Sequence, residues 1–480
     1  MTDPASRRNG AIVLAAGAGA RFGGGKVIAP LDGRPILEHV LGAVRAAGIV
    51  RTVVVLGRDA DRVEVAVAWD GEARTINPTP EAGLSSSLRV GMTTLERLEA
   101  EEVVDHGTGV PAGVFVVLGD QPMVDPAVFR ALAQAEVRAG IGFVVPRYLA
   151  DESMNPVLVL PAGRRWVAEA TGDRGLGPII AAHPELVTEV ELGGGNPDID
   201  TRADLAELAW ADRVRRDRLQ VDRFREVPDG EDFYRPVTGL FRADPRRTDE
   251  PILDALLALA MPDDAWLDIG AGAGRYALPL ALHVREVVAV EPSDGMRAAL
   301  EELAIEHGIG NVRSVADRWP PMVAGPAAGI RADAALIAHL GYDIEAIGPF
   351  LDAMEAAASR LCVAILMERQ PSSIADPFWP PIHGEERVAL PALPEFLELL
   401  RVRGSEPTVL RFPRPPRTAD SVEELHGFVR RHLWLTPGGA KDRRLEALVR
   451  EVAERPDGRW ALPQPRVEIG LVRWSPGRPS

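Results

Sequence analysis

The sequence contains very little cysteine. Its 480 residues include one cysteine, Cys362, so no disulfide can form within the chain, and we expect a protein of the reducing cytosol. Cys362 lies in the apolar run LCVAILM, which is typical of a buried core thiol. No CxxC or HExxH motif occurs, and the nine histidines are scattered along the chain. A zinc site is therefore not expected.

Long apolar runs and an excess of positive charge are also absent. No stretch approaches the uninterrupted run of about 18 apolar residues that a membrane-spanning helix needs. The opening MTDPASRRNG lacks the apolar region of a secretion signal. The net charge is −16, with acidic and basic residues interspersed, which argues against binding to nucleic-acid phosphates. These features predict a cytoplasmic protein that binds neither nucleic acid nor membrane.

The length and the hydrophobic pattern predict two domains. A chain of 480 residues exceeds what one hydrophobic core usually holds. Short β-branched runs alternate with helical stretches rich in Ala and Leu, which predicts βαβ units and parallel sheets. We therefore predict an α/β protein with two Rossmann-like three-layer αβα domains, residues 1–205 and 231–480. A charged helical linker, 206–230, is expected between them.

The expected strands form two series. The first series is AIVLAAG (11–17), TVVVLG (52–57), GVFVVLGD (113–120), FVVP (143–146) and PVLVLP (156–161). The second is WLDIG (266–270), VVAVE (287–291), DAALIAH (333–339) and LCVAILM (361–367). Near the end, two further runs predict an antiparallel hairpin that closes the second parallel sheet: TVLRF (408–412) and RVEIGLVRW (466–474).

A first glycine-rich loop, AGARFGGGK, follows the strand AIVLAAG directly. Glycines allow backbone N–H groups to approach phosphates, and Arg21 and Lys26 add positive charge. A Walker A loop is excluded, because Ala20 and Val27 stand where it requires Gly and Ser or Thr. A tight turn between strand and helix would explain the glycines but not the two cations. The loop therefore predicts a phosphate-binding site.

The segment LAAGAGARFGGGK resembles the signature of the MobA-like nucleotidyltransferases, and its LAAG form with a lone lysine resembles molybdenum cofactor cytidylyltransferases. Further segments are similar in the same order, namely GLSSSLRVG (83–91), LGDQPMV (118–124), NPVLVL, GDRG (172–175) and DIDTRADL (198–205). The resemblance covers residues 10–205. Asn155 departs from it, because relatives often have His before this proline. The preference for an acceptor therefore stays open.

Nucleotidyl transfer brings two anions together, so its catalysis depends mainly on charge neutralisation and alignment. Carboxylates from separate strand ends can hold Mg²⁺ together with substrate phosphates. Asp120, at the end of an apolar strand, is the first candidate for such a ligand, and the resemblance implies Asp200 as the second. It also implies catalytic roles for Arg21, Lys26 and Asp120, and nucleotide contacts from Ala16, Gly17, Gly19, Lys26, Ser85 and Ser86.

Some of these polar residues also have a purely structural interpretation. Asp120 could begin a helix before Pro122, and Asp200 could cap the helix that contains ADLAEL. Ser85 to Ser87 could cap a helix that begins near Leu88. Capping and nucleotide contact are compatible for the serines, so both interpretations stay open.

A second glycine-rich loop, in WLDIGAGAGR, follows another strand. The next strand ends in Glu291, about 20 residues onward, where an acid can accept hydrogen bonds from ribose hydroxyls. This spacing alone also fits a dinucleotide-binding oxidoreductase. However, DIGAGAG resembles motif I of the class I methyltransferases, and VEPSDGM resembles the motif that follows it. The similarity covers residues 230–480, with specific motifs in 265–343.

The methyltransferase resemblance implies that S-adenosylmethionine is bound by Asp268, Gly270, Gly272, Gly274, Glu291 and Asp317. His339 lies where the methyl acceptor should approach, either as a proton acceptor or as a packing residue. The Pro-rich segment DPFWPPIHGEER (376–387) is typical of a loop that lines a substrate site, and FYRPVTGLF (233–241) is a candidate cover for the cofactor.

Together these patterns predict a bifunctional enzyme with small-molecule substrates. Its first domain is expected to transfer a cytidylyl group from CTP, with Mg²⁺, to a molybdopterin-type phosphate and to release pyrophosphate. GTP or another phosphorylated acceptor is the alternative, and a catalytically silent scaffold is a second one. The second domain is expected to methylate an unidentified acceptor or, alternatively, to bind S-adenosylmethionine only as a regulatory module. The resemblance also implies contact with a molybdoenzyme or its chaperone.

Overall fold

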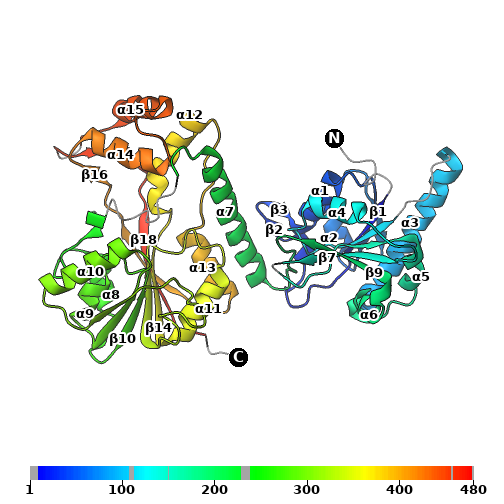
Figure 1. Ribbon diagram of the computed structural model, residues 1–480, viewed down its shortest axis with the longest axis horizontal. Helices are drawn as coiled ribbons and strands as arrows, with labels where there is room; N and C mark the ends of the chain where they lie inside the picture. The colour runs from blue at the N-terminus through cyan, green and yellow to red at the C-terminus, as the bar shows by residue number, and fades with distance from the viewer. Residues whose placement is uncertain are drawn as a thin grey trace. The chain divides into compact units, whose positions relative to one another are not determined.

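The computed structural model describes residues 9–106, 113–149, 151–228, 238–239, 241–455 and 458–477 (Figure 1). The chain divides into two compact units, Met1–Leu205 and Ala206–Ser480. Each unit has a seven-stranded sheet with helices on both faces, so the predicted α/β class with two Rossmann-like three-layer folds is confirmed. No helix in the described part of the chain has the length and hydropathy needed to cross a membrane.

The sheet of the first unit has the strand order β5-β4-β1-β6-β8-β7-β9. Its strands are β1 (Gly10–Ala15), β4 (Arg51–Leu56), β5 (Ala73–Ile76), β6 (Val114–Leu118), β7 (Phe143–Tyr148), β8 (Val157–Val159) and β9 (Val187–Leu192). All run in one direction except β8, which is antiparallel to β6 and β7. The short strands β2 (Pro30–Leu31) and β3 (Arg34–Pro35) form a separate pair. β1 is buried along its whole length because helices cover both faces.

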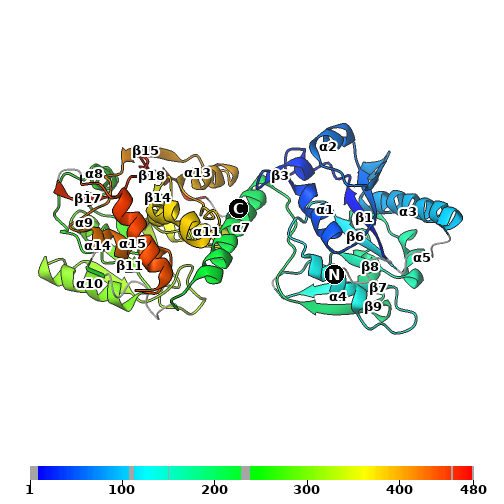
Figure 2. The same cartoon turned by 90° about the horizontal axis from the view of Figure 1, so that it is seen from above.

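The helices of the first unit are α1 (Ile36–Ala46), α2 (Ala60–Ala66), α3 (Leu84–His106), α4 (Pro126–Gln134), α5 (Arg164–Val167) and α6 (Gly177–Ala182). Figure 2 shows α1 and α3 on opposite sides of β1, and α3 shares a hydrophobic core with alternate residues of β1 and β4. A Cβ at Gly91 of α3 would lie 2.4 Å from Ile12 Cγ2. The absence of a side chain at Gly91 therefore lets α3 pack closely on the sheet.

The sheet of the second unit has the order β12-β11-β10-β13-β14-β18-β15. Its strands are β10 (Ala265–Ile269), β11 (Glu286–Val290), β12 (Val312–Val315), β13 (Ala332–Ala338), β14 (Ala358–Met367), β15 (Thr408–Pro413) and β18 (Glu468–Trp474). The first five strands are parallel, and β18 is antiparallel to both β14 and β15. The predicted closing of a parallel sheet by an antiparallel pair is thus confirmed.

Helices cover both faces of this second sheet (Figure 1). α8 (Pro251–Leu257), α9 (Ala277–Ala281) and α10 (Asp294–Glu306) pack on one face, and α11 (Ile347–Ala357) and α13 (Leu393–Val402) pack on the other. The segment 206–230, expected as a linker, contains most of α7 (Arg202–Phe224). Trp210 of α7 is 3% exposed in the core of the second unit, and its indole N–H donates to the Ile344 carbonyl at 3.0 Å. Most of α7 therefore packs as an element of that unit.

Three helices, α12 (Trp379–His383), α14 (Val422–His432) and α15 (Ala440–Val452), form a helical cap beyond one end of this sheet (Figure 1). The cap has a hydrophobic core of its own, to which the 3₁₀ segment Pro371–Phe378 and the paired strands β16 (Thr418–Ala419) and β17 (Trp460–Ala461) contribute. The segment 376–387 is therefore largely helical, and Phe378 and Trp379 are buried in the cap.

His383 of the cap lies beside two aromatic rings, 4.7 Å from Phe224 and 4.3 Å from Trp379 between centroids. Burial, and then the charge of Lys441, lowers its pKa to about 4. The unfolded chain therefore binds this proton more strongly than the folded protein does. The stability that comes from neutral His383 is present above the unfolded pKa of about 6.5 and is lost as the pH falls toward 4.

Replacing His383 by Phe is thus expected to reduce the loss of stability between about pH 6.5 and 4.5. Urea denaturation followed by tryptophan fluorescence measures it, since Trp69 and Trp166 are the only two of the nine tryptophans in the first unit. The variant His307→Phe serves as a control at another histidine of the second unit. Equal loss of stability in wild type and His383→Phe would contradict the prediction.

Candidate active sites

The first glycine loop leaves β1 and turns back on itself. The carbonyl of Gly19 accepts the N–H groups of Phe22 and Gly24 at 3.0 and 3.1 Å. Gly24 has φ +88°, and a Cβ there would meet no atom within 4 Å. Glycine is therefore required by the left-handed backbone and not by lack of space. Gly17 and Gly23 are exposed, while Ala16 is buried, so the loop presents backbone to the solvent at its glycines.

Lys26, at the end of this loop, brings distant parts of the chain together. Its Nζ lies 2.5 Å from Asp120 Oδ2, beyond the end of β6, and 3.4 Å from Asp200 Oδ1, just before α7. Arg21 Nη2 lies 2.8 Å from Asp200 Oδ2. The Lys26 side chain is only 12% exposed, whereas that of Arg21 is 74% exposed. The four residues that the sequence assigned to catalysis and metal binding thus form one cluster.

A further acid, Asp198, belongs to this cluster but was not predicted as a site residue. Burial, and then the charge of Asp120, raises the pKa of Asp198. Gln121 Nε2 donates to Asp198 Oδ1 at 2.7 Å and holds it in place. The alternation of acids in DIDTRADL was the signal that could have identified it, since in an extended segment alternate side chains share a face.

The carboxylates of Asp120 and Asp200 are the candidate metal ligands of this cluster. Among the described residues, no group of three or more His, Cys, Asp or Glu side chains is arranged to hold a metal ion. Two carboxylates, those of Asp120 and Asp200, share the ammonium of Lys26. Mg²⁺ commonly binds through one or two carboxylates plus substrate phosphates. The pair therefore matches the protein ligands of a cation that substrate phosphates also bind.

The serine segment forms the first turn of α3, which begins at Leu84 and not near Leu88 as expected. Ser86 Oγ donates to the Gly83 carbonyl at 2.8 Å, and Asn77 Nδ2 donates to Ser86 Oγ at 2.7 Å. Ser85 is fully buried, and no described residue hydrogen-bonds its Oγ. The serines therefore lie inside the helix rather than at its cap position. Their contact with a nucleotide stays a prediction.

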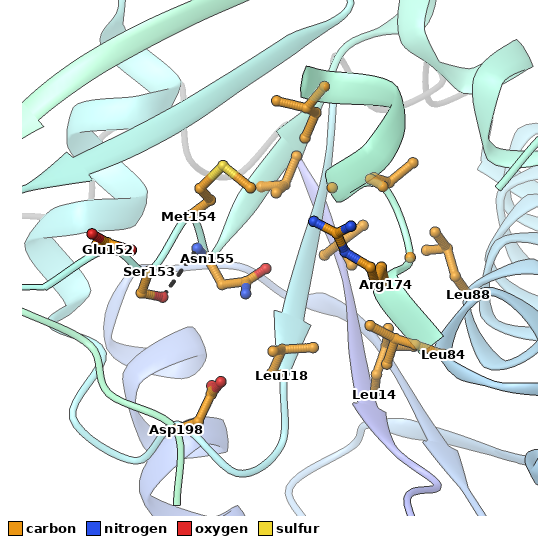
Figure 3. A pocket seen from close by; sticks show the side chains of 16 residues that line it. Leu14, Leu84, Leu88, Leu118, Glu152, Ser153, Met154, Asn155, Arg174 and Asp198 are labelled. Carbon is orange, nitrogen blue, oxygen red and sulfur yellow. Dashed lines mark hydrogen bonds between the residues drawn. The ribbon is translucent and has the colours of Figure 1, made fainter. Parts of the chain in front are cut away.

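A cavity of about 240 Å³ lies beside this segment (Figure 3). Its apolar walls come from Leu14 of β1, Leu118 of β6 and the first turns of α3 and α6, and polar side chains such as Arg174 complete the lining. Figure 3 shows the Arg174 guanidinium and the Asn155 amide directed into the space between them, with Asp198 at the edge. Asp198 therefore connects this cavity to the cluster around Lys26.

The second glycine loop begins directly after β10. Gly270, Gly272 and Gly274 all have positive φ, of 69°, 55° and 83°. A Cβ at Gly270 would lie 2.8 Å from Leu340 Cδ2, and one at Gly274 would lie 2.8 Å from Leu278 Cγ. A Cβ at Gly272 would meet nothing within 4 Å. Gly272 is thus the glycine that faces open space, while the other two allow close packing.

Two acids lie next to this loop. Glu291 Oε2 accepts the N–H of Gly272 at 2.9 Å, and Glu291 Oε1 accepts the N–H of Ser293 at 2.8 Å. Asp268 is 2% exposed, and none of the described residues hydrogen-bonds its Oδ1. Burial, and then the charge of Glu291, raises the pKa of Asp268 to about 7. Glu291, predicted to contact a cofactor, therefore also fixes the shape of the loop.

Asp317 has a similar internal role. Its Oδ1 accepts the N–H of Arg318 at 2.8 Å, and its Oδ2 accepts the N–H of Ala327 at 2.9 Å. The carboxylate thus closes the loop between these residues. The predicted bond from Asp317 to an adenine amino group would have to share these oxygens, and it stays a prediction.

A larger cavity, of about 1010 Å³, lies at the carboxyl ends of β13 and β14. His339 and Met367 line it at the strand ends, and α7 and the helical cap supply other walls. Burial, and then the charge of Arg275, lowers the pKa of His339 to about 4, so its imidazole is neutral near pH 7. Residues 233–237 and 240 of the expected cover lie outside the described residues, but Phe241 lines the cavity.

Comparison with known proteins identifies part of the chain. Residues 11–187 match the family model of the MobA-like NTP transferase domain. The first unit contains a MobA-like NTP transferase domain. The bifunctional protein GlmU of Bordetella parapertussis is 33% identical over 144 residues, which cover 30% of this chain and 29% of the relative. GlmU of Kineococcus radiotolerans is 30% identical over 187 residues, which cover 38% of this chain and 34% of the relative. The chain thus spans about a third of the length of these curated relatives.

Two solved structures are also similar. Rv0371c from Mycobacterium tuberculosis is 27% identical, with a TM-score of 0.35, over 42% of this chain and 98% of that chain. A protein described as a putative methyltransferase from Bacillus halodurans is 15% identical, with a TM-score of 0.35, over 48% of this chain and 100% of that chain.

The match to the MobA-like domain contains the glycine loop, Lys26, the serine segment and Asp120. It ends at Val187, so Asp198 and Asp200 lie beyond it. The assignment of Asp200 therefore depends on its contacts with Lys26 and Arg21 in this structure.

Proposed function

We propose that the MobA-like domain transfers a cytidylyl group from CTP to a molybdopterin-type phosphate and releases pyrophosphate. The observation that carries the proposal is the cluster in which Lys26 contacts Asp120 and Asp200 beside an exposed glycine loop. Such a cluster can neutralise and align two phosphate groups. GTP, or a different phosphorylated acceptor, is the alternative.

Each residue of the cluster has a separate task in this proposal. Asp120 and Asp200 would hold Mg²⁺, which supplies positive charge to the triphosphate. Arg21 and Lys26 neutralise the phosphates, and the glycine loop donates backbone N–H groups to them. The 240 Å³ cavity is smaller than most ligand sites, so it suits a ligand part with one ring system. Arg174 would then lie near a charged group of that ligand.

We propose that the second unit transfers a methyl group from S-adenosylmethionine to an acceptor in the large cavity. The observation that carries this proposal is the open space at Gly272, next to a carboxylate, Glu291, that is bonded to its N–H. When bound, S-adenosylmethionine would supply a methyl carbon whose bond to sulfur breaks with both electrons staying on sulfur. Neutral His339, at the cavity wall, can accept the proton that the acceptor loses, but only as a weak base, because burial lowers its pKa to about 4.

A ligand screen on the full chain tests both proposals. Thermal unfolding is measured with CTP, GTP, adenosylhomocysteine and NADH, because a ligand that binds the folded state raises the unfolding temperature. We expect shifts with CTP plus Mg²⁺ and with adenosylhomocysteine. A shift with NADH alone would favour an oxidoreductase for the second unit. Binding of adenosylhomocysteine without methyl transfer to any tested acceptor would favour a regulatory module.

A further inference from the structure

Three arginines that line the large cavity form no ion pair with an acid within the described residues. Arg414 follows β15, Arg417 precedes β16, and Arg431 lies on α14. No hydrogen bond or ion pair of their side chains is found among the described residues, although the Arg417 guanidinium lies 3.9 Å from the Phe428 ring centroid. We call these three residues the arginine wall.

Other arginines around the same cavity are paired with acids. Arg387 lies 2.5 Å from Asp217, Arg275 lies 2.7 Å from Glu250, and Arg218 lies 2.9 Å from Glu345. The cavity therefore has acids within reach of arginine in several places. The lack of an ion pair at the arginine wall, where Glu424 is the acid that acts on Arg417, is a local feature and not a general shortage of carboxylates.

The arginine wall is also partly removed from water. Each of its members is half-buried, and burial lowers the pKa of all three. The charge of Arg417 adds to this effect for Arg414. For Arg417, the charge of Glu424 opposes the effect and that of Arg431 adds to it. Cations that lose water without gaining an anion destabilise the fold. An anionic ligand would remove this penalty by pairing with them.

The positive charge of the arginine wall also affects the neighbouring residue His432. It lies next to Arg431 on α14, and its pKa is lowered to about 4 by burial together with the charges of Arg431, Arg417 and Arg387. A guanidinium presents its donors in a fork that matches the oxygens of phosphate and carboxylate groups. The volume of about 1010 Å³ suits a small molecule.

We propose that the methyl acceptor of the second unit is a small anionic molecule whose phosphate or carboxylate group is bound by Arg414, Arg417 and Arg431. This inference rests on the proposed methyl transfer. The carboxylate of S-adenosylmethionine is a rival occupant of the arginine wall, so the experiment has to separate the two.

The test is calorimetric titration of the full chain with inorganic phosphate and, separately, with citrate as a carboxylate probe. The double variant Arg417→Gln/Arg431→Gln is compared with Arg430→Gln, a matched control on the same helix, whose guanidinium lies 3.8 Å from Asp442. We expect the double variant to lose one anion site or to bind the better probe at least about tenfold more weakly. Wild type and the control should keep that site.

Adenosylhomocysteine is titrated into the same proteins. Unchanged affinity for it in the double variant, together with the lost anion site, supports the proposal. Weaker binding of adenosylhomocysteine in the double variant would assign the arginine wall to the cofactor carboxylate and overturn the proposal. Unchanged binding of both anion probes would also overturn it. Absence of adenosylhomocysteine binding from wild type would instead overturn methyl transfer itself.

A variant that preserves charge tests whether misfolding causes the loss of anion binding. Arg417→Lys/Arg431→Lys keeps both positive charges but loses the forked geometry. We expect it to bind the anion probe with an affinity between those of wild type and the glutamine variant. Loss equal to that of the glutamine variant, with a lowered unfolding temperature, would show that the arginines act on the fold, and the proposal would be wrong.

Discussion

Replacing Lys26 by Ala is expected to lower the rate of pyrophosphate release by about 10²-fold or more. The ammonium is 2.5 Å from one carboxylate and 3.4 Å from another, so its loss leaves Asp120 and Asp200 to repel incoming phosphates. Pyrophosphate release is measured with CTP, Mg²⁺ and a molybdopterin-type acceptor. Lys441→Ala in the second unit is the matched control, and adenosylhomocysteine binding should be unchanged in both variants.

The neighbouring acids refine this experiment. Asp120→Asn is expected to reduce turnover by a similar factor and to raise the Mg²⁺ concentration needed for half-maximal rate, because an amide binds Mg²⁺ more weakly than a carboxylate does. Asp198→Asn is the comparison, since its carboxylate is bonded to Gln121 and should matter less. A larger loss in Asp198→Asn than in Asp120→Asn would move the metal-ligand assignment to Asp198.

The strands that could be predicted are those with continuous apolar runs. β1, β4, β6, β10 and β14 are buried over most of their length, and such runs identify strands in parallel sheets. The sequence interpretation missed β5, β9 and β12, whose residues are largely half-buried or exposed. All three lie at sheet edges, where one side of the strand has no partner and the apolar pattern is weak.

The direction of a strand in its sheet could not be predicted from the apolar pattern either. PVLVLP predicts a buried strand, but the run contains nothing that tells whether β8 lies parallel or antiparallel to β6. The start of α3 was misplaced for a similar reason. Gly83, just before it, allows the backbone of Gly172 to approach so closely that a Cβ would lie 2.6 Å from Gly172 C. This tertiary contact is not visible in local sequence.

Sequence motifs identified the candidate site residues, but they did not identify the groups that hydrogen-bond to these residues. The family resemblance assigned Lys26, Asp120 and Asp200 to one site, although they lie up to 174 positions apart in the sequence. The bonds from Glu291 to backbone N–H groups depend on loop geometry that no side-chain pattern encodes. The arginine wall was missed because unpaired and solvated arginines look alike in sequence. Only the fold shows which of them form no ion pair.

The cofactor site of the second unit gives the other large expected effect. Replacing Glu291 by Ala should weaken adenosylhomocysteine binding by about 10- to 150-fold, which corresponds to the loss of charge-assisted hydrogen bonds worth roughly 1.5–3 kcal/mol. The same substitution also removes the bonds to Gly272 and Ser293 that shape the loop. Glu291→Gln keeps an acceptor oxygen without the charge, so its affinity should lie between those of wild type and Glu291→Ala. Calorimetry on the full chain measures all three proteins.

Gly272→Val separates a blocked site from a damaged fold. A Cβ at Gly272 meets nothing within 4 Å, so the new side chain should project into the ligand space, with a cost in stability only from its φ of 55°. Gly274→Val is the matched control, because its Cβ would lie 2.8 Å from Leu278 and should destabilise the unit itself. We expect Gly272→Val to abolish adenosylhomocysteine binding with a small change in unfolding temperature. A different outcome would identify a dinucleotide site. In that case wild type binds NADH but not adenosylhomocysteine, and Gly272→Val abolishes the binding of NADH.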